Sequence, residues 1–151
     1  MHGDKKGLRI LVVDDNYDGA TMLSALLELM GHRTCTAYNG LEAVQEAARE
    51  RYDVVLLDLG MPIMDGFRAA AELQQLRPAP MLIACSGWYD AECRRRTTEL
   101  GFSAHLRKPV GFEALEAALG LAYAGWTDPP SARGQGRGSE MQRVAHPNEL
   151  G

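Results

Sequence analysis

The chain has 151 residues, of which 46% are hydrophobic and 24% are charged, and its formal net charge at pH 7 is −4. These values predict one globular domain with a single core, and the negative charge disfavours non-specific binding to nucleic acid. The first apolar run is short and interrupted by Arg9, so we expect neither a signal peptide nor a membrane span. Cys35, Cys85 and Cys93 show no CxxC spacing, which favours reduced thiols in a cytoplasmic protein over disulfides or zinc ligands.

Strand-like and helical segments alternate along the chain. Residues 8–13 are almost all apolar, as expected for a strand buried on both faces of a parallel sheet. Residues 23–30 carry apolar side chains at the i, i+3, i+4 and i+7 positions of one helix face. Residues 32–38 are more polar but contain threonine and tyrosine, which predicts a strand at the sheet edge. A turn at Asn39 then leads to a second helix over 41–48.

The second half of the chain repeats this alternation. The strand-like runs are residues 53–58, 81–85 and 104–107. Helices are predicted over 65–76, 90–100 and 112–122. In the last helix, Phe112, Leu115 and Leu119 are expected to share one apolar face. Five β segments alternating with five helices predict an α/β fold: a doubly wound, flavodoxin-like, five-stranded parallel sheet of order 2-1-3-4-5 with helices on both faces.

The composition changes after Ala124. Residues 125–151 are rich in glycine, proline, serine and arginine, so they bury little apolar area and are predicted to be disordered. We therefore expect an N-terminal extension at 1–7, one folded domain over 8–124 and a tail at 125–151.

Carboxylates follow or end two of the predicted central strands. Asp14 and Asp15 come directly after the first strand, and Asp58 ends the third. Because parallel strands gather their carboxyl ends at one edge of the sheet, these three acids are expected to meet. Their oxygens suit Mg²⁺, which takes a few carboxylates and fills its remaining positions with water or substrate. Taken alone, the Asp14-Asp15 pair or Asp58 is better explained as a solvated strand end, but their meeting at one sheet edge together with a lysine disfavours that explanation.

Two later predicted strands are followed by a hydroxyl and an amine side chain. Ser86 follows the fourth strand and could donate to a phosphoryl oxygen, although a serine in this place is often only part of a turn. Lys108 follows the fifth strand and would supply a point charge, although a single lysine is usually a solvated surface group. Pro109 restricts the chain there and makes the Lys108-Pro109 bond a candidate for the cis form.

These residues together resemble the receiver domains of two-component response regulators. The resemblance rests on the motifs at 12–16, 56–66, 86–87 and 108–109, and it extends over roughly 8–124. It implies that Asp58 is the phosphoacceptor and that Asp14 and Asp15 hold Mg²⁺ with Asp58 and the carbonyl of Gly60. It further implies that Ser86 is the switch hydroxyl and that Lys108 contacts the phosphoryl group.

Three positions depart from the family pattern. His105 stands three residues before Lys108, where the family usually has tyrosine or phenylalanine, so it is a candidate switch residue. The alternative is a strand histidine that faces solvent. Gly60 is small where a bulkier residue is common, and Trp88 places a large aromatic side chain beside the expected phosphoryl pocket.

The resemblance implies a phosphorylatable signalling switch that catalyses its own phosphorylation and dephosphorylation at Asp58. The phosphoryl donor would be a sensor histidine kinase or a phosphotransfer protein, and a downstream protein partner would read the switch. We expect the partner surface on the last two helices and the strand between them, which also allow a homodimer. Two alternatives remain: an interaction module that takes no phosphate, and an aspartyl-phosphate phosphatase, which Gly60 disfavours because such enzymes carry a second aspartate there.

Overall fold

A computed structural model describes residues 7–61, 66–88 and 90–123 of the chain. The strands are β1 (Arg9–Val13), β2 (Arg33–Ala37), β3 (Val54–Asp58), β4 (Met81–Ser86) and β5 (Ala104–Arg107). The helices are α1 (Tyr17–Leu29), α2 (Gly40–Arg49), α3 (Gly66–Leu73), α4 (Ala91–Glu99) and α5 (Phe112–Tyr123). Within these ranges no helix is both long enough and apolar enough to cross a membrane. The tail predicted at 125–151 lies outside the described residues, as does nearly all of the predicted N-terminal extension.

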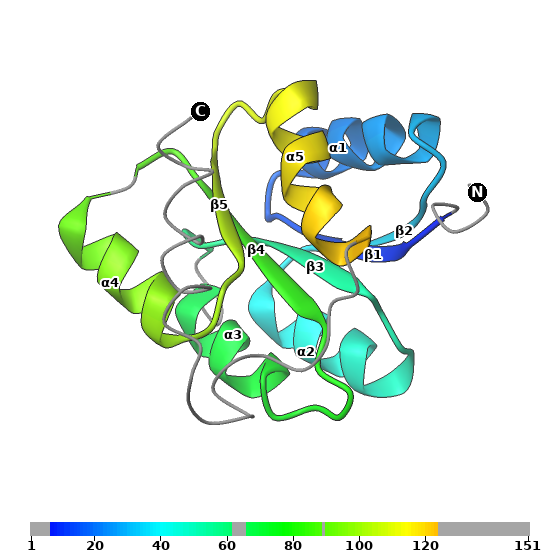
Figure 1. Cartoon of the computed structure of the whole chain (residues 1–151). Helices are drawn as coiled ribbons and strands as arrows, with labels where there is room; N and C mark the ends of the chain where they lie inside the picture. The colour runs from blue at the N-terminus through cyan, green and yellow to red at the C-terminus, as the bar shows by residue number, and fades with distance from the viewer. Residues whose placement is uncertain (1–6, 62–65, 89, 124–151) are drawn as a thin grey trace.

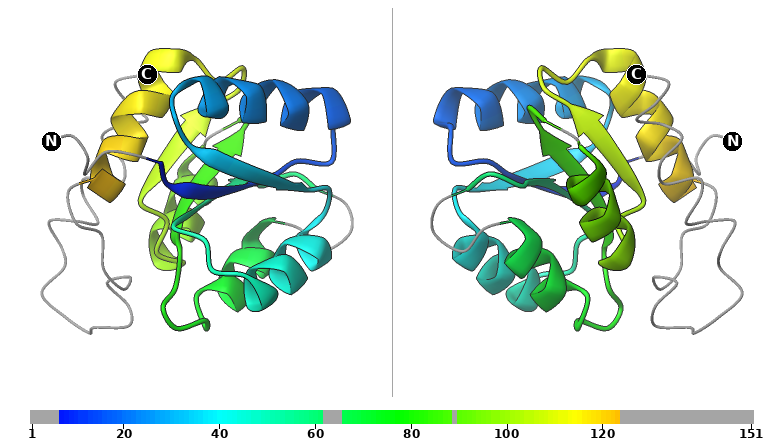
Figure 2. Two further views of the ribbon diagram at one scale, coloured as in Figure 1. Left: turned by 90° about the vertical axis from the view of Figure 1, so that its right-hand side faces the viewer. Right: turned by 90° about the vertical axis from the view of Figure 1, so that its left-hand side faces the viewer.

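The five strands form one parallel sheet in the order β2-β1-β3-β4-β5. This confirms the α/β fold and the strand order predicted from the sequence. Helices α1 and α5 cover one face of the sheet, and α2, α3 and α4 cover the other (Figure 1 and Figure 2). All strands therefore end at one edge, between the two helical layers, where ligands bind in folds of this kind.

Each face of the sheet carries its own hydrophobic core. Alternate residues of the central strands, such as Leu11 and Leu57, are buried with Leu73 in the core beneath α2 and α3. The residues next to them, such as Ile10 and Leu56, belong to the core beneath α1 and α5. Burial of a side chain of this size stabilises the fold by roughly 1.5–3 kcal/mol. Since β1, β3 and β4 are covered on both faces, their ends are held at fixed positions.

The structure corrects two details of the sequence reading. The predicted helix ending at 76 stops at Leu73, because Gln75 and Leu76 continue in tighter turns whose N–H groups bond three residues back. Phe112 was expected on the buried face of the last helix, but its side chain is 47% exposed. It is the first residue of α5 and lies beyond the edge of the core, whereas Leu115 and Leu119 are fully buried.

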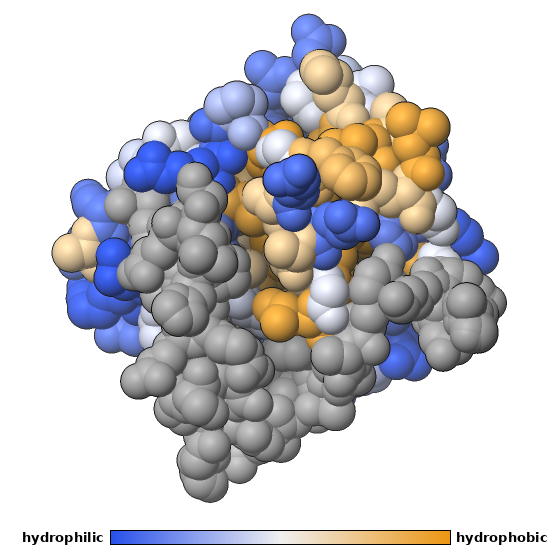
Figure 3. Space-filling model, turned by 45° about the horizontal axis from the view of Figure 1, so that its top comes forward, coloured by the Kyte–Doolittle hydropathy of each residue, from blue (hydrophilic) through white to orange (hydrophobic). Residues whose placement is uncertain are grey.

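Large hydrophobic side chains are exposed on α1 and at the start of α5. Met22 and Leu29 of α1 are 73% and 85% exposed. Phe112, at the start of α5, is about half exposed. Figure 3 shows hydrophobic side chains gathered on the face that carries these two helices. A surface of this kind marks a place where another molecule can bind.

Candidate functional site

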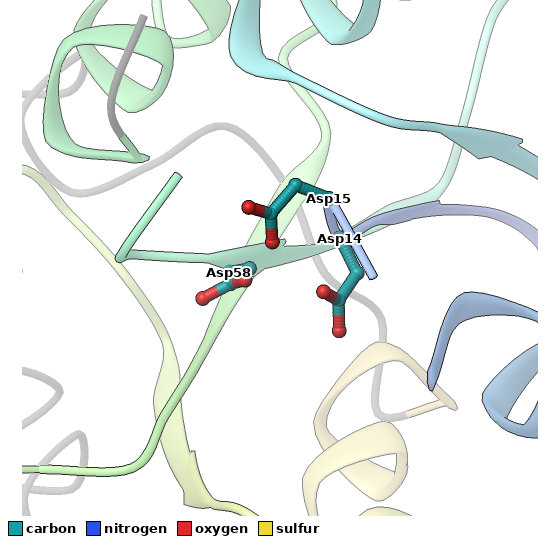
Figure 4. A group of neighbouring side chains, drawn as sticks. All are labelled: Asp14, Asp15 and Asp58. Atoms are coloured by element: carbon teal, nitrogen blue, oxygen red, sulfur yellow. The ribbon is translucent and has the colours of Figure 1, made fainter. Parts of the chain in front are cut away.

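Three carboxylates meet at the carboxyl edge of the sheet. Asp14 and Asp15 leave β1, and Asp58 is the last residue of β3, which pairs in parallel with β1. Each offers a ligand oxygen, and these oxygens all lie within 4.8 Å of one another. Figure 4 shows the three side chains at the ends of their strands. Asp14 and Asp58 are buried, whereas Asp15 is exposed. The group therefore combines two desolvated carboxylates with one that faces solvent.

Lys108 bridges the two buried carboxylates. Its Nζ lies 3.1 Å from Asp14 Oδ2 and 3.2 Å from Asp58 Oδ2. The lysine follows β5, and its backbone N–H donates to the carbonyl of Ser86 at 2.8 Å, which joins the ends of β4 and β5. The Lys108-Pro109 bond is cis, as considered from the sequence. The Lys108 ammonium is therefore placed to form an ion pair with either carboxylate.

Backbone N–H groups hold the other oxygens of these carboxylates. The N–H of Gly60 donates to Asp58 Oδ1 at 3.0 Å, and the N–H of Asn16 donates to Asp14 Oδ1 at 2.9 Å. The Asn16 side chain also accepts from Gly19 N–H and so caps α1. The role of Asn16 was not foreseen, although an asparagine just before a helical segment is a recognisable signal. These bonds fix the orientation of the carboxylates before any ligand arrives.

The electrostatics of the site favour an added cation. Burial raises the pKa of the Asp58 carboxyl above its ordinary value, and Asp14 adds to the rise while the Gly60 N–H and Lys108 oppose it. Burial acts to lower the pKa of Lys108, but Asp58 and Asp14 outweigh burial and raise it. Both pKa values rise, with opposite effects on charge: the charged form of Lys108 is favoured by its two acidic partners, whereas the charged form of Asp58 is disfavoured because Lys108 does not offset its burial. The all-oxygen ligand set and the uncompensated negative charge fit Mg²⁺.

Ser86 and His105 form a buried pair. Ser86 is 1% exposed and His105 is 0% exposed. The Oγ of Ser86 lies 2.9 Å from His105 Nε2, and the hydroxyl also donates to the carbonyl of Trp88. The alternative of a solvent-facing His105 is therefore wrong, because residue 105 pairs with Ala84 in the covered part of the sheet.

Trp88 lies beside the acidic group. A Cβ added at Gly60 would come within 3.8 Å of Asp58 Oδ1 and 3.9 Å of Trp88 Cζ3. The indole therefore reaches the Gly60 side of Asp58, and it remains 44% exposed. Gly66 is required for a different reason, since a Cβ there would lie 2.6 Å from the carbonyl oxygen of Asp58. The sequence did not reveal this close packing of α3 on the end of β3.

Two grooves connect the acidic group with the exposed apolar surface. The first, of about 470 Å³, is lined by Asp14 and Lys108 at one end and by Met22 and Leu26 of α1. The second, of about 540 Å³, lies between α1 and α5 and is lined by Leu26, Leu29, Met30, Phe112, Glu116, Leu119 and Gly120. Leu26 belongs to both grooves, so the surface runs from the carboxylates along α1.

Comparison with known proteins places the chain among signalling domains. Residues 10–120 match the family described as response regulator receiver domain. The chain is 33% identical over 115 residues to the transcriptional regulatory protein ZraR of Escherichia coli, covering 76% of this chain but only 26% of that protein. It is 30% identical over 111 residues to sporulation initiation phosphotransferase F of Bacillus subtilis, covering 74% of this chain and 90% of that protein. It thus spans about a quarter of the first relative and most of the second.

A solved structure agrees with the sequence matches. The receiver domain of sensor histidine kinase PA1611 from Pseudomonas aeruginosa, described with magnesium coordinated in its active site cleft, superposes with a TM-score of 0.71 at 30% identity. The match covers 79% of this chain and 99% of that domain.

Proposed function

This chain belongs to the response regulator receiver domain family, and from that membership we propose that it is a two-component switch whose phosphoacceptor is Asp58. A receiver domain is a signalling module, so its chemistry is the transfer of a phosphoryl group onto itself and the later loss of that group. The observation that carries the proposal is the position of Asp58. It lies between the Lys108 ammonium and the Gly60 N–H, within 4.8 Å of the ligand oxygens of Asp14 and Asp15.

This geometry supports the following transfer step. A carboxylate oxygen of Asp58 forms the O–P bond as the N–P bond of a phosphohistidine donor breaks, and the released imidazole keeps its electron pair and takes up a proton. Burial removes water from the attacking carboxylate, and the Gly60 N–H fixes its orientation. Lys108, already 3.2 Å from Asp58, supplies positive charge to the incoming phosphoryl oxygens.

The acidic group is proposed to bind Mg²⁺. Asp14, Asp15 and Asp58 would hold the ion, with the carbonyl of Gly60 as a further ligand. The bound ion would neutralise charge on the carboxylates and on the phosphoryl oxygens. Support comes from the oxygen-only ligand set and from the negative charge that Lys108 leaves unbalanced. Ser86 is proposed as the hydroxyl that responds to the phosphoryl group.

The phosphoryl donor is proposed to be a sensor histidine kinase or a phosphotransfer protein that docks over α1 and the start of α5. This face carries the exposed Met22 and Leu29, and its groove leads to Asp14 and Lys108. By contrast, α4 presents Arg95 in ion pairs with acids of its own helix, a pattern typical of a solvated face. The surface expected on the last two helices is retained as the proposed site for the downstream partner or a homodimer. We propose the cytoplasm as the compartment, in line with three unpaired cysteines.

The phosphatase alternative has no support in this site. Position 60 is glycine and cannot act as the general acid, and the Trp88 indole lies beside it. The inert-module alternative conflicts with the convergence of Asp14, Asp58 and Lys108 on one point.

Labelling with acetyl phosphate tests the proposal. The protein should incorporate phosphate in the presence of Mg²⁺ and not in the presence of a chelator, and mass spectrometry should place the adduct at Asp58. Asp58→Asn should abolish the label because an amide cannot accept the group. An adduct on a histidine or serine, with Asp58 unmodified, would contradict the proposal.

A further inference from the structure

The hydroxyl of Ser86 is the middle member of a directed chain of hydrogen bonds. Its Oγ contacts two groups, the carbonyl of Trp88 and His105 Nε2. A carbonyl can only accept, so the single hydroxyl proton lies between Ser86 and Trp88. His105 Nε2 must then be the donor to Ser86 Oγ. The order is therefore His105 N–H to Ser86 O–H to the carbonyl of Trp88.

The surroundings make this arrangement costly to break. Ser86 and His105 are both almost fully buried, so a donor left without an acceptor there loses the full benefit of its hydrogen bond. The strand register explains why the pair forms. His105 lies opposite Ala84 in the β4–β5 pairing, and Ser86 follows two residues later on the same face of the sheet.

The same hydroxyl has a second possible partner. If Asp58 carries a phosphoryl group, Ser86 can donate its proton to a phosphoryl oxygen only by giving up the carbonyl of Trp88. This rotation also moves Oγ relative to the His105 N–H that donates to it. Two hydrogen bonds therefore oppose the movement of the Ser86 hydroxyl toward a phosphoryl group, one to the carbonyl of Trp88 and one from His105. The family usually has tyrosine or phenylalanine at the position of His105.

We propose that His105 is a positioning residue that holds the Ser86 hydroxyl in its resting orientation and so weakens the response to phosphorylation. The inference rests on the proposed function, since it needs a phosphoryl group on Asp58. His105 makes no contact with the reacting atoms in this proposal. The effect of His105 passes through Ser86, and that effect depends on the N–H donor of the imidazole rather than on the size of the ring.

Titration with beryllofluoride and Mg²⁺ tests this proposal. Trp88 reports binding because its indole lies next to Gly60, and Trp126→Phe removes the second of the two tryptophans from the signal. In that background His105→Phe should bind beryllofluoride more tightly by a factor of about 3–10, the equilibrium worth of one hydrogen bond. His105→Gln should stay close to the parent, because its amide nitrogen is the same number of bonds from Cβ and still donates. Thermal melts of each variant establish that it is folded.

A double-mutant cycle separates positioning from a general packing effect. In a Ser86→Ala background His105→Phe should no longer change the affinity, because the acceptor of its bond is gone. Equal beryllofluoride affinities of His105→Phe and the parent would overturn the inference. It would also be overturned if His105→Phe still raised the beryllofluoride affinity in the Ser86→Ala background. Failure of the parent protein to bind beryllofluoride at all would instead sink the proposed function, and this inference with it.

Discussion

Lys108 Nζ lies 3.2 Å from Asp58 Oδ2, which joins the end of β5 to the end of β3 across β4. The pair lies in a largely desolvated place, with the Asp58 side chain 9% exposed and that of Lys108 34% exposed. Even so, the pKa of the Asp58 carboxyl is raised, chiefly by burial. The ion pair therefore leaves the charged form of Asp58 poorly stabilised in the folded protein.

Replacing Asp58 should stabilise the metal-free protein. Because the folded-state pKa of Asp58 is raised, the ionised carboxyl is less favourable in the folded than in the unfolded chain. That cost is fully present above the folded pKa and is relieved as pH falls toward the ordinary aspartate value. Asp58→Asn should thus increase the free energy of unfolding at neutral pH by about 0.5–2 kcal/mol, the scale of single stabilising substitutions. The gain should shrink at acidic pH. Urea denaturation at both pH values measures it, and a pH-independent difference would show that desolvation of Asp58 is not the cause.

Magnesium should stabilise the protein in a pH-dependent way. A ligand that binds only the folded state adds about 2.7 kcal/mol at a hundred times its dissociation constant. The affinity should fall as pH drops, because the raised pKa of Asp58 lets protons compete with the ion at a higher pH than usual. Thermal shifts with and without MgCl₂ measure the effect.

Asp15→Asn should lose most of this magnesium shift while barely changing the metal-free melting temperature, because Asp15 is exposed. Asp18→Asn is the matched control, since Asp18 is an exposed acid of α1 outside the carboxylate group. A magnesium shift retained in Asp15→Asn and lost in Asp18→Asn would place the ion elsewhere.

Trp88→Ala should shorten the lifetime of the aspartyl phosphate several-fold. The indole lies on the Gly60 side of Asp58, and we expect it to restrict the approach of water to the phosphorus atom of a phosphorylated Asp58. Loss of labelled phosphate after removal of acetyl phosphate gives the lifetime. Phe112→Ala serves as control, because Phe112 is similarly exposed but lies on α5. An unchanged lifetime in Trp88→Ala would leave Trp88 as a packing or partner-surface residue.

Substitution of the exposed face of α1 should impair protein donors but not acetyl phosphate. Met22→Glu and Leu29→Glu each place a charge in the apolar surface, and we expect about tenfold slower transfer from a phosphohistidine donor. Ala91→Glu on α4 places the same charge on an exposed position of the other candidate surface. A donor can be found by profiling the sensor kinases of the source organism. Slower transfer with Ala91→Glu and normal transfer with the α1 variants would move the donor site to the last two helices.

Removal of the tail should leave folding and labelling intact. Among the described residues, the members of the two hydrophobic cores run from Leu8 to Ala122, and the composition of residues 125–151 offers little apolar area. A chain ending at Ala124 should therefore melt at the same temperature and label at the same rate. Loss of the folded state would show that the tail contributes to the core or to a dimer.

The order of the strands and the meeting of the acids followed from the sequence because both depend on short-range patterns. Apolar runs such as 54–57 are buried on both faces of a parallel sheet, and right-handed crossovers leave few possible orders. Once β1 and β3 are parallel neighbours, Asp14 and Asp58 come together at one edge of the sheet. The prediction therefore needed no knowledge of side-chain orientation.

Other features depend on contacts between side chains that are distant in sequence. The burial of His105 against Ser86 requires the β4–β5 register, and the approach of Trp88 to Gly60 depends on the path of the loop after β4. Phe112 lies on an apolar stripe in the sequence, yet its place at the first turn of α5 leaves it exposed. Local periodicity states which face of an element is apolar, but the packing of neighbouring elements determines which of those side chains are covered and which polar groups pair.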